Sequence, residues 1–159
     1  MTFSIALLGS TGSIGKSTLK ALKKDKKYKV KLLTTNTNAN RVFKQAIQFK
    51  VKNVIITNQI KYNKYKLLFK KKNINLYLGL HNIKKILRRK ISYTINAISG
   101  IEGLEPSLDI IPYTENFLIA NKESIICGWK LINYKLKKYN TKFIPIDSEH
   151  FSIWKLIQN

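Results

Sequence analysis

The stretch FSIALLGSTGSIG, residues 3–15, decides the fold. Its first part, 3–9, is a short apolar run typical of a buried strand. Its second part, GSTGSIG at 9–15, carries three glycines and leads into a helix that we expect to reach about Lys24. A glycine turn that follows the first strand and opens the first helix brings helix amides against the phosphates of a dinucleotide. The stretch therefore predicts a dinucleotide site, with a plain strand–helix turn as the alternative.

The rest of the chain repeats the alternation of strand and helix. Helices are expected at 40–50, at 84–90, at 123–138 and in the lysine-rich segment before 74, and Trp129 is expected in the core. Such alternation predicts an α/β fold, a Rossmann-like doubly wound parallel sheet with helices on both faces and right-handed crossovers. The further strands are expected at 30–35, 53–57, 74–78, 93–98, 115–121 and 142–147.

The end of the second strand indicates which dinucleotide. NAD-binding folds usually carry an acid there, which holds the ribose 2′-hydroxyl. Residues 34–38 read TTNTN and contain no acid, and Arg41 follows one turn later. An uncharged end with a nearby guanidinium suits a 2′-phosphate, which favours NADP over NAD.

The charge of the chain invites a second reading. Thirty Lys and Arg against eight acids give a net charge of +22, which could attract nucleic acid. Only Arg41, Arg88 and Arg89 are arginines, whereas arginine is the residue that grips phosphate with two donors. The lysines accompany many Ile, Asn, Tyr and Phe residues, all with A/T-rich codons. A genome biased toward A and T would produce such a surface without selection for a polyanion partner. We therefore expect a solvated lysine surface, and treat nucleic acid as the less favoured partner.

Two sequence features bear on location. The single cysteine, Cys127, excludes an internal disulfide and fits a reducing compartment. The N-terminal apolar run has no basic leader and is too short for a membrane anchor. We expect a cytoplasmic protein without a membrane partner.

The stretch PIDSEH, residues 145–150, places Asp147 and Glu149 one residue apart in a chain poor in acids. In an extended segment both side chains point to the same side, so both can reach one ion. Hard carboxylate oxygens suit Mg²⁺ or Mn²⁺. The alternative is that both acids begin a final helix, with Ser148 as its N-cap.

Four stretches taken together resemble one known family. They are GSTGSIG (9–15), AISGIEGLEPSL (97–108), ANKES (120–124) and PIDSEH (145–150), and they resemble 1-deoxy-D-xylulose 5-phosphate reductoisomerase. The family's proteins are well over twice as long as this sequence. The resemblance implies an NADPH-binding Rossmann-like domain at 1–141 and the start of the catalytic, metal-binding domain at 142–159.

The resemblance also implies roles for individual residues. Lys122 would contact the substrate and be catalytic together with Glu149, while Asp147 and Glu149 would ligate Mg²⁺ or Mn²⁺. Ser148 and Glu149 would hold the substrate. The NADPH site would be formed by Gly9, Thr11, Gly12, Ser13, Ile14, Gly15, Asn38, Arg41, Asn121 and Glu123.

The implied reaction belongs to the non-mevalonate route to isoprenoids. The family rearranges the phosphosugar 1-deoxy-D-xylulose 5-phosphate to an aldehyde and reduces it with NADPH, giving 2-C-methyl-D-erythritol 4-phosphate. It forms homodimers. Because the sequence covers only the N-terminal portion, we expect a fragment, a truncated gene product or one piece of a split enzyme whose partner is a separate C-terminal piece, and in each case a chain that is inactive alone.

One departure from the family pattern is visible. The family commonly has Gly-Lys-Asn where this chain has Asn36-Thr37-Asn38, so the lysine that would meet a 2′-phosphate is missing. Arg41 or another cation would have to substitute for it. The alternatives are another NADP-dependent dehydrogenase of the same fold, or a lysine-rich nucleic-acid-binding protein on a decayed enzyme scaffold.

Overall fold

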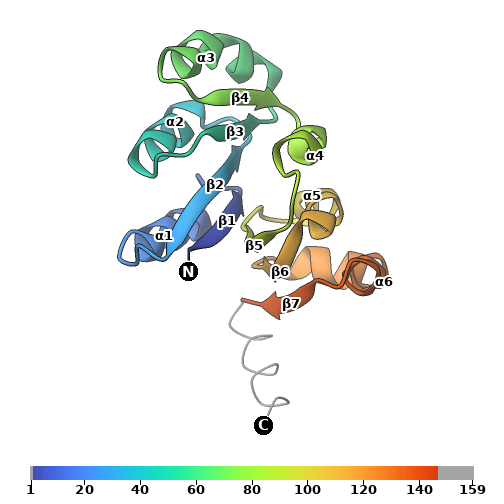
Figure 1. Cartoon of the computed structure of the whole chain (residues 1–159). Coiled ribbons are helices and arrows are strands. Elements are labelled where there is room, and N and C mark those ends of the chain that lie inside the picture. The colour runs from blue at the N-terminus through green and yellow to red at the C-terminus, as the bar shows by residue number, and fades with distance from the viewer. Residues whose placement is uncertain (1, 147–159) are drawn as a thin grey trace.

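The computed structural model describes residues 2–146, so Asp147, Ser148 and Glu149 lie outside the described residues. Within this range the chain forms one sheet of seven parallel strands in the order β4-β3-β2-β1-β5-β6-β7 (Figure 1). The strands are β1 Phe3–Leu8, β2 Tyr28–Thr35, β3 Asn53–Ile56, β4 Asn75–Leu78, β5 Ile91–Asn96, β6 Thr114–Ile119 and β7 Lys142–Pro145.

Six α-helices and three short 3₁₀ turns connect these strands. The α-helices are α1 Ser13–Leu22, α2 Ala39–Gln48, α3 Gln59–Lys71, α4 Ile83–Ile86, α5 Leu104–Ile110 and α6 Lys122–Lys138. The 3₁₀ turns are η1 Leu80–Asn82, η2 Ile101–Gly103 and η3 Ile111–Tyr113.

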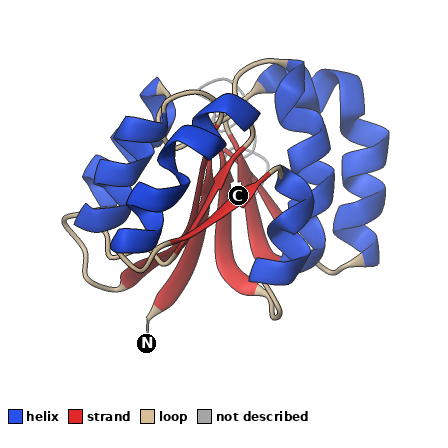
Figure 2. Ribbon diagram, turned by 90° about the horizontal axis from the view of Figure 1, so that it is seen from above, coloured by secondary structure: helices blue, strands red, loops and turns tan. Residues whose placement is uncertain are grey.

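The sheet is covered on both faces, as Figure 2 shows. Alternate side chains of β1 enter opposite layers: Ile5 and Leu7 join one apolar cluster, whereas Ala6 and Leu8 join the other. The first cluster lies under α1, α2 and α3, and the second lies under α4, α5 and α6. Burial on both faces explains the apolar runs Ile5–Leu8 in β1 and Val54–Ile56 in β3. The fold class predicted from the sequence is confirmed.

The order of the strands creates a crevice. The chain winds outward from β1 to β4 and then returns to β5 on the other side of β1. The connections after β1 and β5 therefore leave toward opposite faces of the sheet. Ligands of open α/β sheets bind at such a point, outside the carboxyl ends of the strands.

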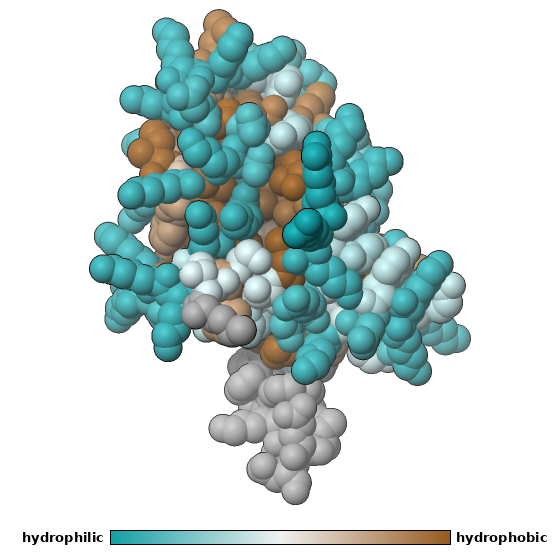
Figure 3. All heavy atoms as spheres, viewed as in Figure 1, coloured by the Kyte–Doolittle hydropathy of each residue, from teal (hydrophilic) through white to brown (hydrophobic). Residues whose placement is uncertain are grey.

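The lysine runs lie on the outside of this framework. Lys64, Lys66 and Lys70 on α3 are exposed, as are Lys23 and Lys26 after α1. Hydrophilic side chains cover much of the surface in Figure 3, with apolar groups visible between them. The solvated lysine surface expected from the sequence matches this placement.

Three local predictions differ from the structure. Helix α5 was not expected; Pro106 lies in its first turn, where a missing N–H is tolerated. The helix expected at 84–90 is only the four residues of α4. The prediction that Trp129 lies in the core is wrong, because its side chain is 41% exposed and rests edge-on against Phe143 of the edge strand β7.

Candidate functional site

Two glycines of the turn after β1 are required by the fold itself. Gly9 has a φ of +72°, and a Cβ there would lie 2.8 Å from the carbonyl oxygen of Ala97. A Cβ at Gly15 would lie 2.5 Å from the Gly9 oxygen and 2.6 Å from the Cα of Ser10. Only glycine permits this conformation and these approaches. The turn, the first turn of α1 and the end of β5 are therefore packed backbone against backbone.

The third glycine is different. A Cβ at Gly12 would have its nearest neighbour at 3.5 Å, an ordinary contact, and Gly12 is exposed with extended backbone. It caps α1 without a side-chain hydrogen bond, and the first turn of α1 contains no acid. The first amides of a helix have no partners within the helix and attract anions. A missing side chain at residue 12 thus leaves the N-terminus of α1 open to a phosphate.

The turn is tied to the end of β2. The Gly9 amide donates to Thr34 Oγ1 at 3.0 Å, and the Ser10 amide donates to the Thr34 carbonyl at 2.9 Å. The hydroxyls of Thr11 and Thr35 are 2.7 Å apart. The two threonines of β2, which the sequence analysis did not assign to the site, hold the turn in place.

The end of β2 leads into α2 through an uncharged segment. Asn38 caps α2, and its Oδ1 accepts from the Arg41 amide at 3.2 Å. Asn36 accepts from the Thr57 hydroxyl at 3.1 Å. Arg41 is exposed in the first turn of α2. Asn38 and Arg41 are therefore brought to the same edge of the sheet as the glycine turn.

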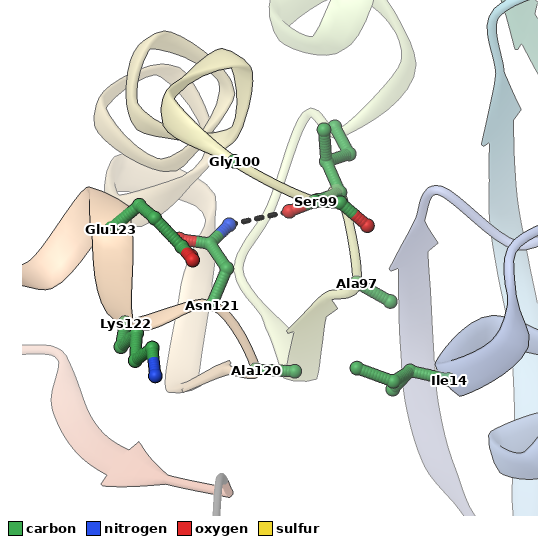
Figure 4. A pocket seen from close by; sticks show the side chains of 9 residues that line it. Ile14, Ala97, Ser99, Gly100, Ala120, Asn121, Lys122 and Glu123 are labelled. Carbon is green, nitrogen blue, oxygen red and sulfur yellow. Dashed lines mark hydrogen bonds between the residues drawn. The ribbon is translucent and has the colours of Figure 1, made fainter.

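A cavity of about 290 Å³ opens at the carboxyl ends of β5 and β6, beside the first turn of α1. Ile14 enters it from α1, and on the other side lie the small residues Ala97 and Ala120 (Figure 4). Lys122 and Glu123 reach it from the first turn of α6. The cavity is lined by Ile14, Ala97, Ile98, Ser99, Gly100, Ala120, Asn121, Lys122 and Glu123.

Asn121 fixes the wall of this cavity. Its side chain is buried, and its Oδ1 accepts from the Ser124 amide at 3.0 Å. Its Nδ2 donates to the Ile98 carbonyl, the contact drawn as a dashed line in Figure 4. Lys122 and Glu123, in contrast, are exposed. Asn121 thus lines the cavity with its polar atoms already bonded within the chain, and its two neighbours present their charged groups.

A second asparagine, which the sequence analysis missed, holds the same loop from the other side. Asn96 is fully buried at the end of β5, and its Oδ1 accepts from the Ile98 amide at 3.0 Å. Its Nδ2 donates to the Gly103 carbonyl at 2.8 Å and lies 2.7 Å from Ser107 Oγ. Both peptide groups of Ile98 are therefore clamped. The available signal was an asparagine, a residue that strands disfavour, at the end of β5.

The described residues thus hold the predicted cofactor residues in two groups, one around the glycine turn and the end of β2, the other at the start of α6. Ile14 joins them, since it belongs to the first group and lines the cavity. In residues 2–146 no three His, Cys, Asp or Glu side chains gather as a metal site would need. The predicted metal ligands Asp147 and Glu149, with Ser148, fall outside that range.

A Rossmann-like sheet with an open helix N-terminus, at the crevice where the connections after β1 and β5 diverge, is characteristic of dinucleotide-binding domains. Comparison of sequences identifies the family. The sequence profile of 1-deoxy-D-xylulose 5-phosphate reductoisomerase matches residues 5–128, and the chain belongs to this family.

Curated relatives carry the same name. The reductoisomerase of Pelagibacter ubique is 50% identical, with 98% of this chain and 41% of the relative covered. That of Thermotoga maritima is 37% identical, with 97% and 39% covered. The chain therefore spans about 40% of the length of the relatives that it matches.

Solved structures agree. The Zymomonas mobilis reductoisomerase in complex with NADPH superposes with a TM-score of 0.86 at 28% identity, covering 94% of this chain and 40% of that one. A second reductoisomerase, bound to NADPH, fosmidomycin and magnesium, gives 0.85 at 27% identity, covering 93% and 37%. Staphylococcus aureus homoserine dehydrogenase, at 15% identity and 0.53, shares the fold alone.

No helix within residues 2–146 is long and apolar enough to cross a bilayer.

Proposed function

We propose that this chain is the NADPH-binding portion of a 1-deoxy-D-xylulose 5-phosphate reductoisomerase of the non-mevalonate isoprenoid route. The observation that carries the proposal is the open N-terminus of α1 at Gly12, beside a cavity whose far wall is the ANKES segment. The reductoisomerases solved with NADPH superpose on this part of the fold. The proposed division is a cofactor domain at 1–141 and the start of a catalytic domain at 142–159.

The residues present fit NADPH. The turn from Gly9 to Gly15 would receive the phosphates, mainly through the amides of Ser13 and Ile14 and the Thr11 side chain, with Gly12 leaving room for them. Asn38 and Arg41 would meet the adenosine ribose and its 2′-phosphate, because no acid stands there to repel it. Asn121 would fix the wall of the cavity, and Glu123 would border it. When bound, NADPH supplies the hydride for the reduction.

The substrate side of the site involves charged groups next to the cavity. Lys122 is exposed at its edge, which suits contact with an anionic phosphosugar. Asp147 and Glu149 would ligate Mg²⁺ or Mn²⁺, with Ser148 and Glu149 on the substrate. A relative bound to magnesium and fosmidomycin supports a small-molecule substrate and a divalent metal.

The relatives have residues that this sequence does not cover, and these would complete the site. We therefore expect a polypeptide of these 159 residues to bind NADPH without turning over the substrate. A separate C-terminal piece, a homodimer and a cytoplasmic location remain part of the proposal.

A chimera tests the proposal. Residues 1–159 would be joined to the C-terminal remainder of the Pelagibacter ubique relative, which is 50% identical over the shared part. The expected result is metal-dependent oxidation of NADPH on addition of the pentulose phosphate. The remainder alone and the chimera with Gly12→Val should be inactive, because the first lacks the cofactor domain and the second blocks the phosphate turn.

Two outcomes would contradict the proposal. A folded chimera that binds NADPH but does not convert the pentulose phosphate would overturn the assigned reaction. Binding of duplex DNA by the chain with a steep salt dependence, together with no saturable NADPH binding, would favour the nucleic-acid alternative.

A further inference from the structure

One buried polar side chain connects the two ends of the proposed cofactor site. Gln45 lies in the second half of α2 and is 8% exposed. Its Oε1 accepts from Ser10 Oγ at 2.8 Å, and its Nε2 donates to the Ser10 carbonyl at 2.9 Å. A carboxamide without partners in this position would be costly, so the pair of bonds sets where Gln45 and Ser10 lie relative to each other.

The chemistry of this pair fits glutamine. It requires an acceptor facing a hydroxyl and a donor facing a carbonyl, both at the end of one side chain. The opposite orientation of the amide would set two oxygens against each other at the Ser10 carbonyl. Methionine has a similar length and can provide neither bond.

The position of Ser10 in turn sets the position of the phosphate turn, the segment 9–15 that would receive the cofactor phosphates. It is fully buried, and its amide donates to the Thr34 carbonyl of β2 at 2.9 Å. Gly15 packs directly on it, since a Cβ there would lie 2.6 Å from the Ser10 Cα. The first turn of α1 thus rests on a residue that α2 holds in position.

Helix α2 also carries the other end of the site. Arg41 lies one turn before Gln45 on the same helix, and Asn38 caps that helix. The Gln45–Ser10 pair therefore links the amides that would receive the pyrophosphate to the helix that would meet the adenosine 2′-phosphate.

We propose that Gln45 is a positioning residue for NADPH, which keeps the phosphate turn and the start of α2 at the spacing that the dinucleotide requires. The proposal rests on the proposed function and adds a residue that would touch no part of the cofactor. The spacing between the turn and the start of α2 matters because a ligand that must first correct it uses part of its binding free energy to do so, which lowers its affinity.

The test compares Gln45→Met with a matched control, Thr141→Val. Thr141 is also buried, and its hydroxyl is bonded to the carbonyls of Ile111 and Thr114 at the opposite, amino edge of the strands. Both variants of the 159-residue chain should lose some stability toward urea. Gln45→Met should raise the Kd for NADPH about tenfold, whereas Thr141→Val should leave it within about twofold.

Two further readouts separate positioning from general stability. The losses of affinity in Ser10→Ala and in Gln45→Met should add only in part in the double variant, because both remove the bond between Ser10 Oγ and Gln45 Oε1, while Ser10→Ala leaves the Ser10 carbonyl bonded to Gln45. The amide NMR signals of residues 11–15 should shift in ligand-free Gln45→Met and stay in place in Thr141→Val.

The outcomes are distinguishable from failure of the proposed function. If the unsubstituted chain shows no saturable NADPH binding, the proposed function fails. If it binds, and Gln45→Met binds equally well or loses no more affinity than Thr141→Val, the positioning role of Gln45 is overturned while the function stands.

Discussion

The two walls of the candidate site are built by opposite means. On the α1 side, Gly9 and Gly15 bring backbone against backbone by having no side chain. On the α6 side, Asn96 and Asn121 hold the backbone of Ile98 with side-chain hydrogen bonds. The first wall relies on the absence of side chains and the second on satisfied polar groups, so substitutions should damage them differently.

The largest effect is expected at Gly15. Gly15→Val places a side chain where even a Cβ would lie 2.5 Å from the Gly9 oxygen, and backbone atoms cannot yield as a flexible side chain would. Urea unfolding should show a loss of about 3 kcal/mol or more in the free energy of unfolding. A stability close to that of the unsubstituted chain would mean that the turn is not packed as described.

Gly12→Val separates ligand binding from folding within the same wall. The free energy of unfolding should change by less than about 1 kcal/mol, since a Cβ at this position makes only an ordinary contact at 3.5 Å. Affinity for NADPH should fall about a hundredfold, because the side chain covers the N-terminus of α1. Unchanged affinity in a fluorescence titration would mean that the phosphates of NADPH do not bind at this turn.

On the opposite wall, Asn96→Leu leaves the Ile98 amide without its partner, whereas the Gly103 carbonyl keeps its bond from Ser107 Oγ. We expect a loss of about 2 kcal/mol in the free energy of unfolding, because an unsatisfied buried group carries its full desolvation cost. The control is Asn75→Leu, whose exposed bond to Asn53 should contribute less than about 0.5 kcal/mol. Equal losses in the two variants would contradict the clamp on Ile98.

The features that the sequence predicted are local, and those that it did not predict depend on contacts between distant elements. The glycine turn and the strands are local signals, and both were predicted, as was the sheet. The bonds of Gln45 to Ser10 and of Asn96 to Gly103 depend on which elements meet, so spacing alone does not reveal them. The prediction that Trp129 is in the core failed because α6 lies over the edge strand β7. There the apolar face of the helix extends past the sheet.

The smallest effect should appear at the end of β2. Arg41→Met should weaken NADPH about tenfold and leave NADH unchanged, because only NADPH carries the 2′-phosphate. Arg88→Met is the matched control: it removes the same charge from an exposed residue just before β5, at the opposite edge of the sheet. If both substitutions weaken both nucleotides equally, Arg41 acts only through net charge.

The most direct measurement is a fluorescence titration of the purified chain with NADPH and with NADH at moderate and at higher salt. Salt matters because a chain of net charge +22 attracts any polyanion non-specifically, and salt screens this electrostatic attraction. We expect saturable binding that prefers NADPH at both salt concentrations. Binding that is equal for the two nucleotides and disappears as salt rises would contradict it.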